Sequence, residues 1–445
     1  MSTTRAGFGI DRRGLILAAT ASVGLVAVGG ARGALATAAA PFRAALSLNP
    51  GVEGLLDKGL VYRDGRRTAR TLRELQALFV AHGSREVYAR MGTSRLLPIG
   101  GRNSGIASTL ARARLSRELG LAFNPELLLC GVYGDVAGQP APDFSAYPQI
   151  RLRKPWHEVG IEEMADAMRI YGAIAAREIL DTGAKVSKWD IGNEVEFGIA
   201  GVAIHVPGNR FGPYLAPDAV DPEIGKMTQP RFFGMQQADQ LSWASTHLWP
   251  HVARIMTAVA EGIRQVDPVA RFATHTSTIA GFLPGLLVGF YKAMDAGGFH
   301  TEELGTSWYP TSAPLTNRIA TFRRIAEAAR AQLGRPLFVA EYGYPALPVN
   351  YAGQNWANAV PGYPVSPQGQ ADFLRDLAHW GASTGLLSGI RPWGPDLARA
   401  DWNGMALFNR ESDTLALARP ALSAIQEGVR AAAIQRPIPA EWRAA

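Results

Sequence analysis

Cysteine is the scarcest residue in this chain: 445 residues include 1 Cys, alongside 8 His. A single cysteine cannot form an intrachain disulfide, and it excludes a metal site built from several thiolates. The histidines show no close ligand pairing, so we expect no metal site and no cofactor. Cys130 follows an apolar run, Leu127-Leu128-Leu129, and we interpret it as a small buried side chain.

Long runs of like charge are missing as well. The net charge of +7 is mild for this length, and no Lys/Arg run resembles a nucleic-acid patch, so we expect no nucleic-acid partner. No Gly-rich phosphate loop follows the first predicted strand, which argues against an open sheet that binds dinucleotides. With 47% hydrophobic and 19% charged residues, the composition is that of a globular protein.

The amino terminus resembles an export signal. Asp11-Arg12-Arg13-Gly14-Leu15-Ile16-Leu17 is a twin-arginine pattern, a mildly apolar stretch continues to Gly30, and Ala34-Leu35-Ala36 matches an A-x-A cleavage site. The stretch is too short and too rich in small residues to be a good membrane span. We predict a twin-arginine signal peptide over residues 1–36 and a periplasmic or secreted protein without stable membrane insertion after cleavage. An uncleaved anchor is the alternative.

Residues 37–445 alternate between strand-like and helix-like segments. The predicted strands lie near 42–48, 85–90, 126–133, 185–191, 270–275, 303–309, 336–341 and 385–391, and the predicted helices begin at a capping box at 71–74 and lie over 105–120, 160–182, 244–265, 284–296, 316–333, 368–383 and 420–435. Alternation of this kind implies parallel strands with right-handed crossovers. About eight such units favour a closed (β/α)8 TIM barrel, an α/β fold with a single catalytic domain.

Two predicted strands end in a glutamate. Trp189-Asp190-Ile191-Gly192-Asn193-Glu194 and Leu337-Phe338-Val339-Ala340-Glu341 each carry a short apolar run to a carboxylate. The carboxyl ends of barrel strands form the catalytic face, so the two carboxylates can face each other across a sugar. Glycoside cleavage requires this pair, one carboxyl as acid/base and one as nucleophile. We therefore predict that Glu194 and Glu341 are catalytic.

Several polar and aromatic residues near the strand ends are candidates for substrate binding. The Asn193 amide can hydrogen-bond a sugar 2-hydroxyl. Arg90 can pair with the nucleophile and keep it ionised, Tyr309 can donate to Glu341, and His275 can line the sugar site. Trp308, Trp393 and Trp402 are candidates for stacking on sugar rings. Two long segments, 197–240 and 345–367, follow the catalytic strands and would shape the cleft.

These segments resemble glycoside hydrolase family 53, the endo-β-1,4-galactanases, from about residue 50 to residue 415. Gly192-Asn193-Glu194 resembles the family's acid/base motif and Ala340-Glu341-Tyr342-Gly343-Tyr344-Pro345 its nucleophile motif. Further similarities are found in Val87 to Arg90, Val266-Asp267-Pro268 with Thr274-His275, Gly305-Thr306-Ser307-Trp308-Tyr309-Pro310, Ser366-Pro367-Gln368-Gly369-Gln370 and Trp402-Asn403. The resemblance implies a barrel, Glu194 as acid/base, Glu341 as nucleophile, and retention of configuration.

The chain departs from the family pattern around the expected sugar subsites. The family's Tyr-Ser-Asp-x-Trp-Ala-Asp-Pro is replaced by Tyr133-Gly134-Asp135-Val136-Ala137-Gly138-Gln139-Pro140. The first Asp is kept as Asp135, which we take as a further candidate for substrate binding, whereas the Trp and the second Asp are absent. The Arg-Leu-Arg pattern is Tyr88-Ala89-Arg90, and the last strand carries Ile390-Arg391-Pro392-Trp393. These changes leave the catalytic pair intact and put the substrate in doubt.

We predict a retaining glycoside hydrolase, expected to be a monomer, that acts on a galactan-like polysaccharide or oligosaccharide. One alternative is a retaining barrel hydrolase for another β-glycan, such as a bacterial exopolysaccharide. The other is a non-catalytic sugar-binding protein on the same fold.

Overall fold

The computed structural model describes residues 41–95, 104–131, 133–136, 138–207, 219–312, 317–351, 354–399 and 401–443. The predicted signal peptide over residues 1–36 lies outside this part of the chain. Within it, no helix is both long and apolar enough to cross a membrane.

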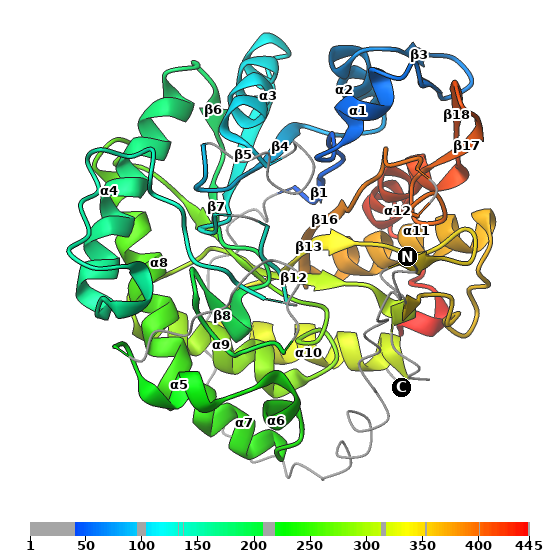
Figure 1. Cartoon of the computed structure of the whole chain (residues 1–445). Coiled ribbons are helices and arrows are strands. Elements are labelled where there is room, and N and C mark those ends of the chain that lie inside the picture. Colours follow the sequence, from blue (N-terminus) through cyan, green and yellow to red (C-terminus); the bar gives the residue numbers. More distant parts are fainter. Residues whose placement is uncertain are drawn as a thin grey trace, which may run out of the picture.

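Parallel strands form a ring at the centre of the molecule, and helices surround it (Figure 1). In order around the ring, the strands are β1 (Arg43–Ala44), β4 (Glu86–Met91), β5 (Ala122–Leu127), β6 (Lys185–Val186) continued by β7 (Trp189–Ile191), β10 (Phe272–Ala273) continued by β11 (His275–Thr276), β12 (Leu304–Trp308), β13 (Leu337–Tyr342) and β16 (Leu387–Pro392). Each neighbouring pair that is hydrogen-bonded runs parallel. This is the strand order of the predicted TIM barrel.

The backbone ladder is interrupted at two places in the described ring. The fifth strand of the ring is interrupted at Thr274, so its first part, β10, pairs with β7 and its second part, β11, pairs with β12. Between β1 and β4 side chains replace the ladder, because the Tyr88 backbone N–H donates to Ser47 Oγ at 2.8 Å and the Leu48 backbone N–H donates to Gln76 Oε1 at 3.3 Å. The buried backbone donors are thus satisfied without a strand pair.

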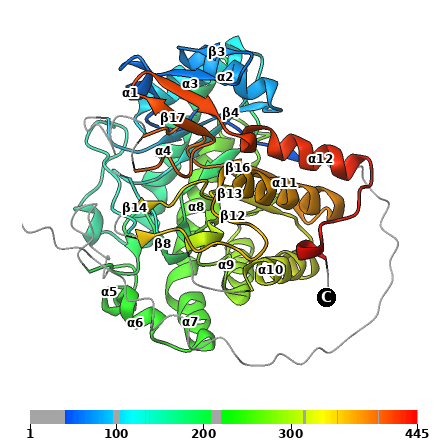
Figure 2. The same ribbon diagram turned by 90° about the vertical axis from the view of Figure 1, so that its right-hand side faces the viewer.

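The long helices that follow the strands of the ring pack on its outside. They are α2 (Leu72–Ala81), α3 (Ile106–Glu118), α4 (Ile161–Leu180), α8 (Trp249–Arg264), α9 (Pro284–Ala296), α10 (Arg318–Leu333), α11 (Pro367–Thr384) and α12 (Ala424–Ala433). The capping box predicted at Thr71 and Glu74 opens α2. Figure 2 shows α11 and α12 side by side on one flank. A continuous apolar layer lies between strands and helices.

One predicted strand is wrong. The segment expected over 126–133 is observed as β5, Ala122–Leu127. The apolar run after Glu126 suggested a buried strand, whereas the real strand carries Asn124 and Glu126, both of which are fully buried. Polar residues inside the strand broke the hydrophobic pattern that marks a buried strand.

Additions to the barrel come from the segments that follow the carboxyl ends of its strands. A four-stranded sheet of β2 (Val61–Arg63), β3 (Thr68–Ala69), β17 (Phe408–Ser412) and β18 (Leu415–Ala418) lies with α1 (Val52–Leu56) over a second apolar cluster. The long segment after Glu194 folds into a hairpin, β8 (Gly198–Ile199) with β9 (Val202–Ala203), and the short helices α5 (Pro222–Lys226), α6 (Gln229–Phe233) and α7 (Gln237–Trp243).

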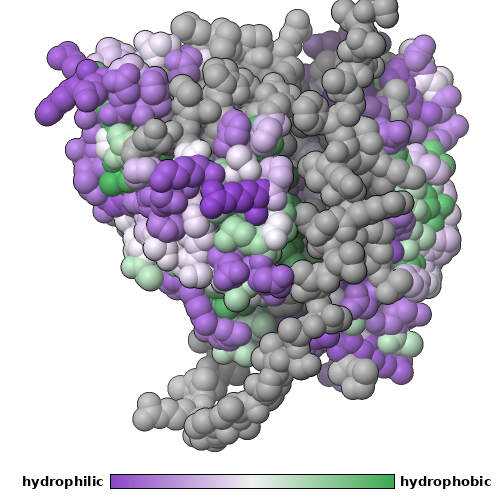
Figure 3. All heavy atoms as spheres, turned by 60° about the horizontal axis from the view of Figure 1, so that its bottom comes forward, coloured by the Kyte–Doolittle hydropathy of each residue, from purple (hydrophilic) through white to green (hydrophobic). Residues whose placement is uncertain are grey.

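The face drawn in Figure 3 is mainly hydrophilic wherever described residues are coloured.

Charged side chains gather at the amino ends of the strands. Glu303, just before β12, accepts hydrogen bonds from Arg43 Nη2 at 2.5 Å and Ser388 Oγ at 2.6 Å, and it pairs with Lys188. Burial alone would raise the pKa of Glu303, but Lys188 and Arg43 outweigh it and hold that pKa well below its usual range. We name Arg43, Lys188, Glu303 and Ser388 the amino-end cluster. Its cations contact the Phe338 ring, at 4.2 Å for Arg43 and 4.3 Å for Lys188.

Candidate active site

Glu194 is placed at the carboxyl end of β7 by an unusual backbone. Gly192 has φ 79°, and Glu194 itself has φ 52°, in the left-handed region that non-glycine residues rarely adopt. The Gln139 side-chain amide donates to the Asn193 carbonyl at 2.7 Å and so holds this turn. The chain then continues as a short 3-10 turn, Val195–Phe197. Glu194 thus lies at the mouth of the barrel rather than along the strand, with 8% of its surface accessible.

Negative neighbours surround the Glu194 carboxyl. Its Oε2 accepts a hydrogen bond from the Val136 backbone N–H at 3.3 Å. Among the described residues, no lysine or arginine forms a salt bridge with it. Burial, followed by the negative charges of Glu341 and Asp135, raises the pKa of Glu194 well above its ordinary value. A carboxyl held protonated beside a second carboxylate is suited to act as a general acid.

Glu341 has the opposite environment. It lies in β13, where Tyr309 OH donates to its Oε2 at 2.7 Å and Arg90 Nη2 donates to its Oε1. Each oxygen of the Glu341 carboxyl thus accepts a hydrogen bond, one from a phenolic hydroxyl and one from a guanidinium. The structure therefore brings the two predicted catalytic glutamates together and gives a cation to only one of them.

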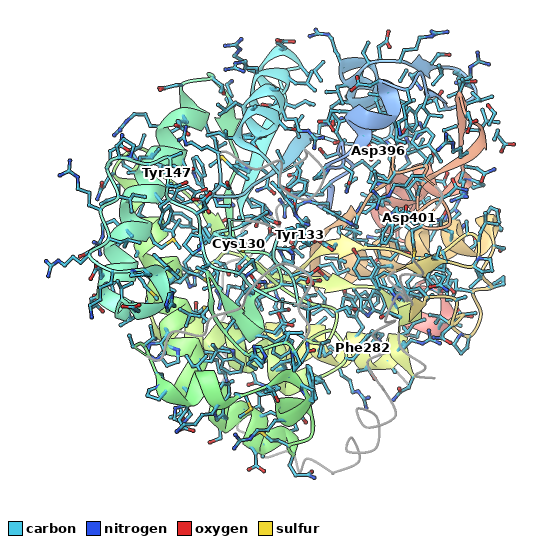
Figure 4. The ribbon with its side chains drawn as sticks, viewed as in Figure 1. Cys130, Tyr133, Tyr147, Phe282, Asp396 and Asp401 are labelled. Atoms are coloured by element: carbon cyan, nitrogen blue, oxygen red, sulfur yellow. The ribbon has the colours of Figure 1, made fainter. Side chains whose placement is uncertain are left out.

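Arg90 links the predicted site residues. Besides Glu341, its guanidinium donates to Asn193 Oδ1 at 2.5 Å and to Tyr133 OH at 3.0 Å, and it stacks 4.0 Å from the centre of the Trp393 ring. Figure 4 shows Tyr133 near the middle of the ring of strands. Because Arg90 is fully buried, its orientation is fixed by these contacts.

His275 and Asn193 form one buried pair. His275 Nε2 lies 2.9 Å from Asn193 Oδ1, and Asn193 Nδ2 donates to the Gly134 carbonyl at 2.8 Å. Burial lowers the pKa of His275 to about 3, so its imidazole is neutral. A neutral histidine orients the asparagine without adding a charge to the site. Sugar contacts of His275 and Asn193 stay a prediction.

The remaining predicted residues lie at different depths. Asp135 is half-buried in the loop beside Glu194, where its backbone pairs with Gly138. Trp393 covers Arg90 and is partly exposed. Trp402 packs edge-on against Tyr309, with ring centres 6.4 Å apart, and is only 3% exposed. Stacking of Trp393 or Trp402 on a sugar also stays a prediction.

Trp308 is not in the site, and its predicted stacking role is wrong. The side chain is fully buried, lies flat on Phe322 with ring centres 4.0 Å apart, and contacts Trp442. Side chains alternate between the two faces of a strand. The Ser307 side chain faces Glu194 inside the barrel. Trp308, the next residue of the strand, therefore points outward to α10.

Glu126, Tyr88 and Tyr133 are site residues that were not predicted. Tyr88 OH donates to Glu126 Oε2 at 2.7 Å, and Arg90 Nε lies 2.7 Å from Glu126 Oε1. Period-two alternation from Arg90 would have identified Tyr88 as inward-facing. We name Arg90, Glu126, Asn193, Glu194, His275 and Glu341 the catalytic cluster. No group of three or more metal-ligating side chains occurs within the described ranges.

Comparisons with known proteins agree with this geometry. The family model for glycosyl hydrolase family 53 matches residues 143–417, more than half of the chain, and this range includes both glutamates. An uncharacterized protein from the bgaB 5' region of Niallia circulans is 23% identical over 305 residues, covering 67% of this chain and 70% of the relative.

Solved structures share the fold. The family 53 catalytic domain of Ignisphaera aggregans has a TM-score of 0.63 at 17% identity, covering 88% of this chain and 97% of that domain. A structure from a study of two fungal β-1,4-galactanases has a TM-score of 0.61 at 17% identity, covering 86% of this chain and 99% of the galactanase chain. The chain belongs to glycosyl hydrolase family 53 and is a glycoside hydrolase with a TIM-barrel fold.

Proposed function

We propose that the protein is a retaining β-glycosidase that cleaves a galactan-like polysaccharide by double displacement. Glu194 protonates the leaving glycosidic oxygen while Glu341 attacks the anomeric carbon. Glu194 then removes a proton from water, which hydrolyses the glycosyl-enzyme. The observation that carries this proposal is the contrast between the two carboxyls, because one has a raised pKa and the other accepts hydrogen bonds from Arg90 and Tyr309.

The substrate class is supported by the similarity to a β-1,4-galactanase structure and by the family match. The first test is reducing-sugar release from β-1,4-galactan by the chain from residue 37 onward, beside its Glu341→Gln variant. We expect release by the native protein alone. Proton NMR during the reaction shows which anomer of the product forms first, and we expect it to be the β anomer. First formation of the α anomer would rule out double displacement.

A second candidate substrate is another β-glycan, such as a bacterial exopolysaccharide. It is favoured by the loop Tyr133-Gly134-Asp135-Val136-Ala137-Gly138-Gln139-Pro140, which departs from the family pattern, and by the long segment 197–240 after Glu194. A panel of defined β-glycans distinguishes the two. Release from another glycan and none from galactan would support this candidate.

Export by a twin-arginine signal is also proposed, and its support is the sequence of residues 1–36. Replacing both Arg12 and Arg13 with Lys should retain the protein in the cytoplasm, as cell fractionation would show. Unchanged export of this variant would contradict the proposal.

A further inference from the structure

A third carboxyl, that of Glu126, lies beneath the catalytic pair. It is fully buried on β5, and its Oε2 accepts a hydrogen bond from Tyr88 OH. Arg90 Nε is 2.7 Å from its Oε1, but the N–H of that nitrogen is directed to Tyr88 OH, also at 2.7 Å. Within the described residues, Oε1 therefore has no hydrogen-bond donor. An ionised carboxylate buried with one donor is poorly satisfied.

The hydrogen-bond pattern fixes the tautomer of His275. Since Asn193 Nδ2 donates to the Gly134 carbonyl, Asn193 Oδ1 must be the acceptor that faces His275. His275 Nε2 therefore carries the hydrogen, and Nδ1 is left as a bare acceptor. This Nδ1 is buried, has no partner among the described residues, and lies 3.8 Å from Glu126 Oε2. Two acceptors face each other here unless a proton lies between them.

The charges around Glu126 disfavour its ionised form. The groups that face it are Tyr88 and Arg90 on β4, Asp190 on β7, His275 on β11, Glu341 on β13 and Arg391 on β16. Of the two cations, Arg391 already pairs with Asp190 and Glu86 at 3.5 Å. Arg90 is thus the cation that Glu126 and Glu341 would have to share.

We propose that Glu126 is a positioning residue that holds a proton against Nδ1 of His275 and so leaves the charge of Arg90 to Glu341. The proposal requires the 3.8 Å separation between Glu126 Oε2 and His275 Nδ1 to shorten to hydrogen-bond distance. Burial, opposed by Arg90, raises the pKa of Glu126 to about 7, in keeping with this assignment. The role in turnover rests on the proposed glycosidase function, whereas the protonation state does not.

The protonation state is tested by thermal unfolding of the native protein and Glu126→Gln between pH 5 and 8. A carboxyl whose pKa is raised in the fold contributes stability at low pH that is lost as the pH rises through the folded value. Glutamine has no proton to lose. We therefore expect the Tm of Glu126→Gln minus that of the native protein to increase by about 2 °C over this range.

The matched control is Glu303→Gln, at a carboxyl whose pKa is lowered in the fold. Its Tm difference from the native protein should become more negative from pH 3 to 5 and then level off. If Glu126→Gln behaves in the same way as this control, Glu126 is an ionised partner of Arg90 and the proposal is wrong.

The consequence for turnover is tested by the pH dependence of kcat/KM. Glutamine keeps a neutral donor for His275 Nδ1, so the ratio of Glu126→Gln to native kcat/KM should rise about threefold between pH 5.5 and 8. A purely structural role would leave this ratio constant with pH, and a constant or falling ratio overturns the positioning role. If the native protein has no activity on galactan, the substrate proposal fails, while the unfolding data still decide the state of Glu126.

Discussion

The two ends of the barrel interior hold buried charge in opposite ways. In the amino-end cluster, the Glu303 carboxylate contacts Lys188, Arg43 and a hydroxyl, so it has two cations beside it. In the catalytic cluster, Glu126 and Glu341 share Arg90, Glu194 lies near Glu341, and His275 is neutral. The first arrangement holds a carboxylate permanently ionised. The second keeps Glu341 close enough to Glu194 to raise the pKa of Glu194.

This difference shows which part of the ring is built for stability and which for chemistry. Buried charges that are fully paired do not titrate near neutral pH, and removing one partner leaves the other uncompensated. Buried carboxyls without their own cations stay ready to exchange protons, at a cost to stability. The four experiments below test that division.

The largest effect is expected at Glu194. Glu194→Ala removes the general acid, and its kcat/KM on galactan should fall by about 10³- to 10⁴-fold. On an aryl glycoside whose phenol leaves without protonation, the fall should be much smaller, as measured by release of the phenol. Glu341→Gln serves as the control and should lose activity on both substrates. Equal losses by Glu194→Ala on both would assign Glu194 another role.

The amino-end cluster should respond in stability instead. Glu303→Gln removes the carboxylate that pairs with buried Lys188, while Arg43 keeps Glu86 at 3.5 Å, and should lower the free energy of unfolding by about 3 kcal/mol at pH 7. Because the pKa of Glu303 is lowered in the fold, the loss should be full above about pH 5 and should shrink gradually as the pH falls from the ordinary value of 4.5 toward the folded pKa. Urea unfolding at pH 7 and pH 3 measures the full loss and its decrease. A fall in kcat/KM of more than about twofold would contradict the assignment of the amino-end cluster to stability rather than to catalysis.

Tyr309 is expected to have an intermediate effect on turnover. Tyr309→Phe removes the hydroxyl that donates to Glu341 and should lower kcat/KM about 10- to 100-fold, the cost of one hydrogen bond to a charged group. Tyr344→Phe is the matched control, because the Tyr344 hydroxyl donates to the Tyr363 carbonyl instead of to a carboxylate. Similar losses in both variants would point to altered packing rather than to loss of the donor.

Trp308 should show the smallest effect. It lies at the carboxyl end of β12, in the same strand that begins beside Glu303, yet it faces the outer helices. Trp308→Phe should lower the free energy of unfolding by about 1 kcal/mol and leave KM unchanged. An increase in KM with unchanged stability would place Trp308 at the sugar after all.

The sequence was most informative where a buried strand ends in a charged residue. Glu194 and Glu341 end apolar runs, and that pattern led to the catalytic pair, while the alternation of about eight strand-like and helix-like units led to the barrel. Glu126 was missed because it lies inside a strand, where a charge argues against a buried strand unless its partners are known. Those partners, Tyr88 and His275, come from other strands of the ring and are visible only in three dimensions.

Trp308 shows an error that local reasoning could have avoided. Residues of one strand alternate between the barrel interior and the helix layer. Once Tyr309 and Ser307 are assigned to the interior, Trp308 must face outward. The charges of the amino-end cluster were harder to foresee, because Arg43, Lys188 and Glu303 lie just outside or at the start of their strands.

The left-handed backbone at Glu194 sets folding against activity at a single position. A glutamate with φ 52° stores on the order of 1 kcal/mol that glycine would not. Random mutagenesis selected only for heat resistance should therefore recover glycine or asparagine at this position, in inactive proteins. Glutamate at this position is therefore expected to persist only where selection for turnover continues.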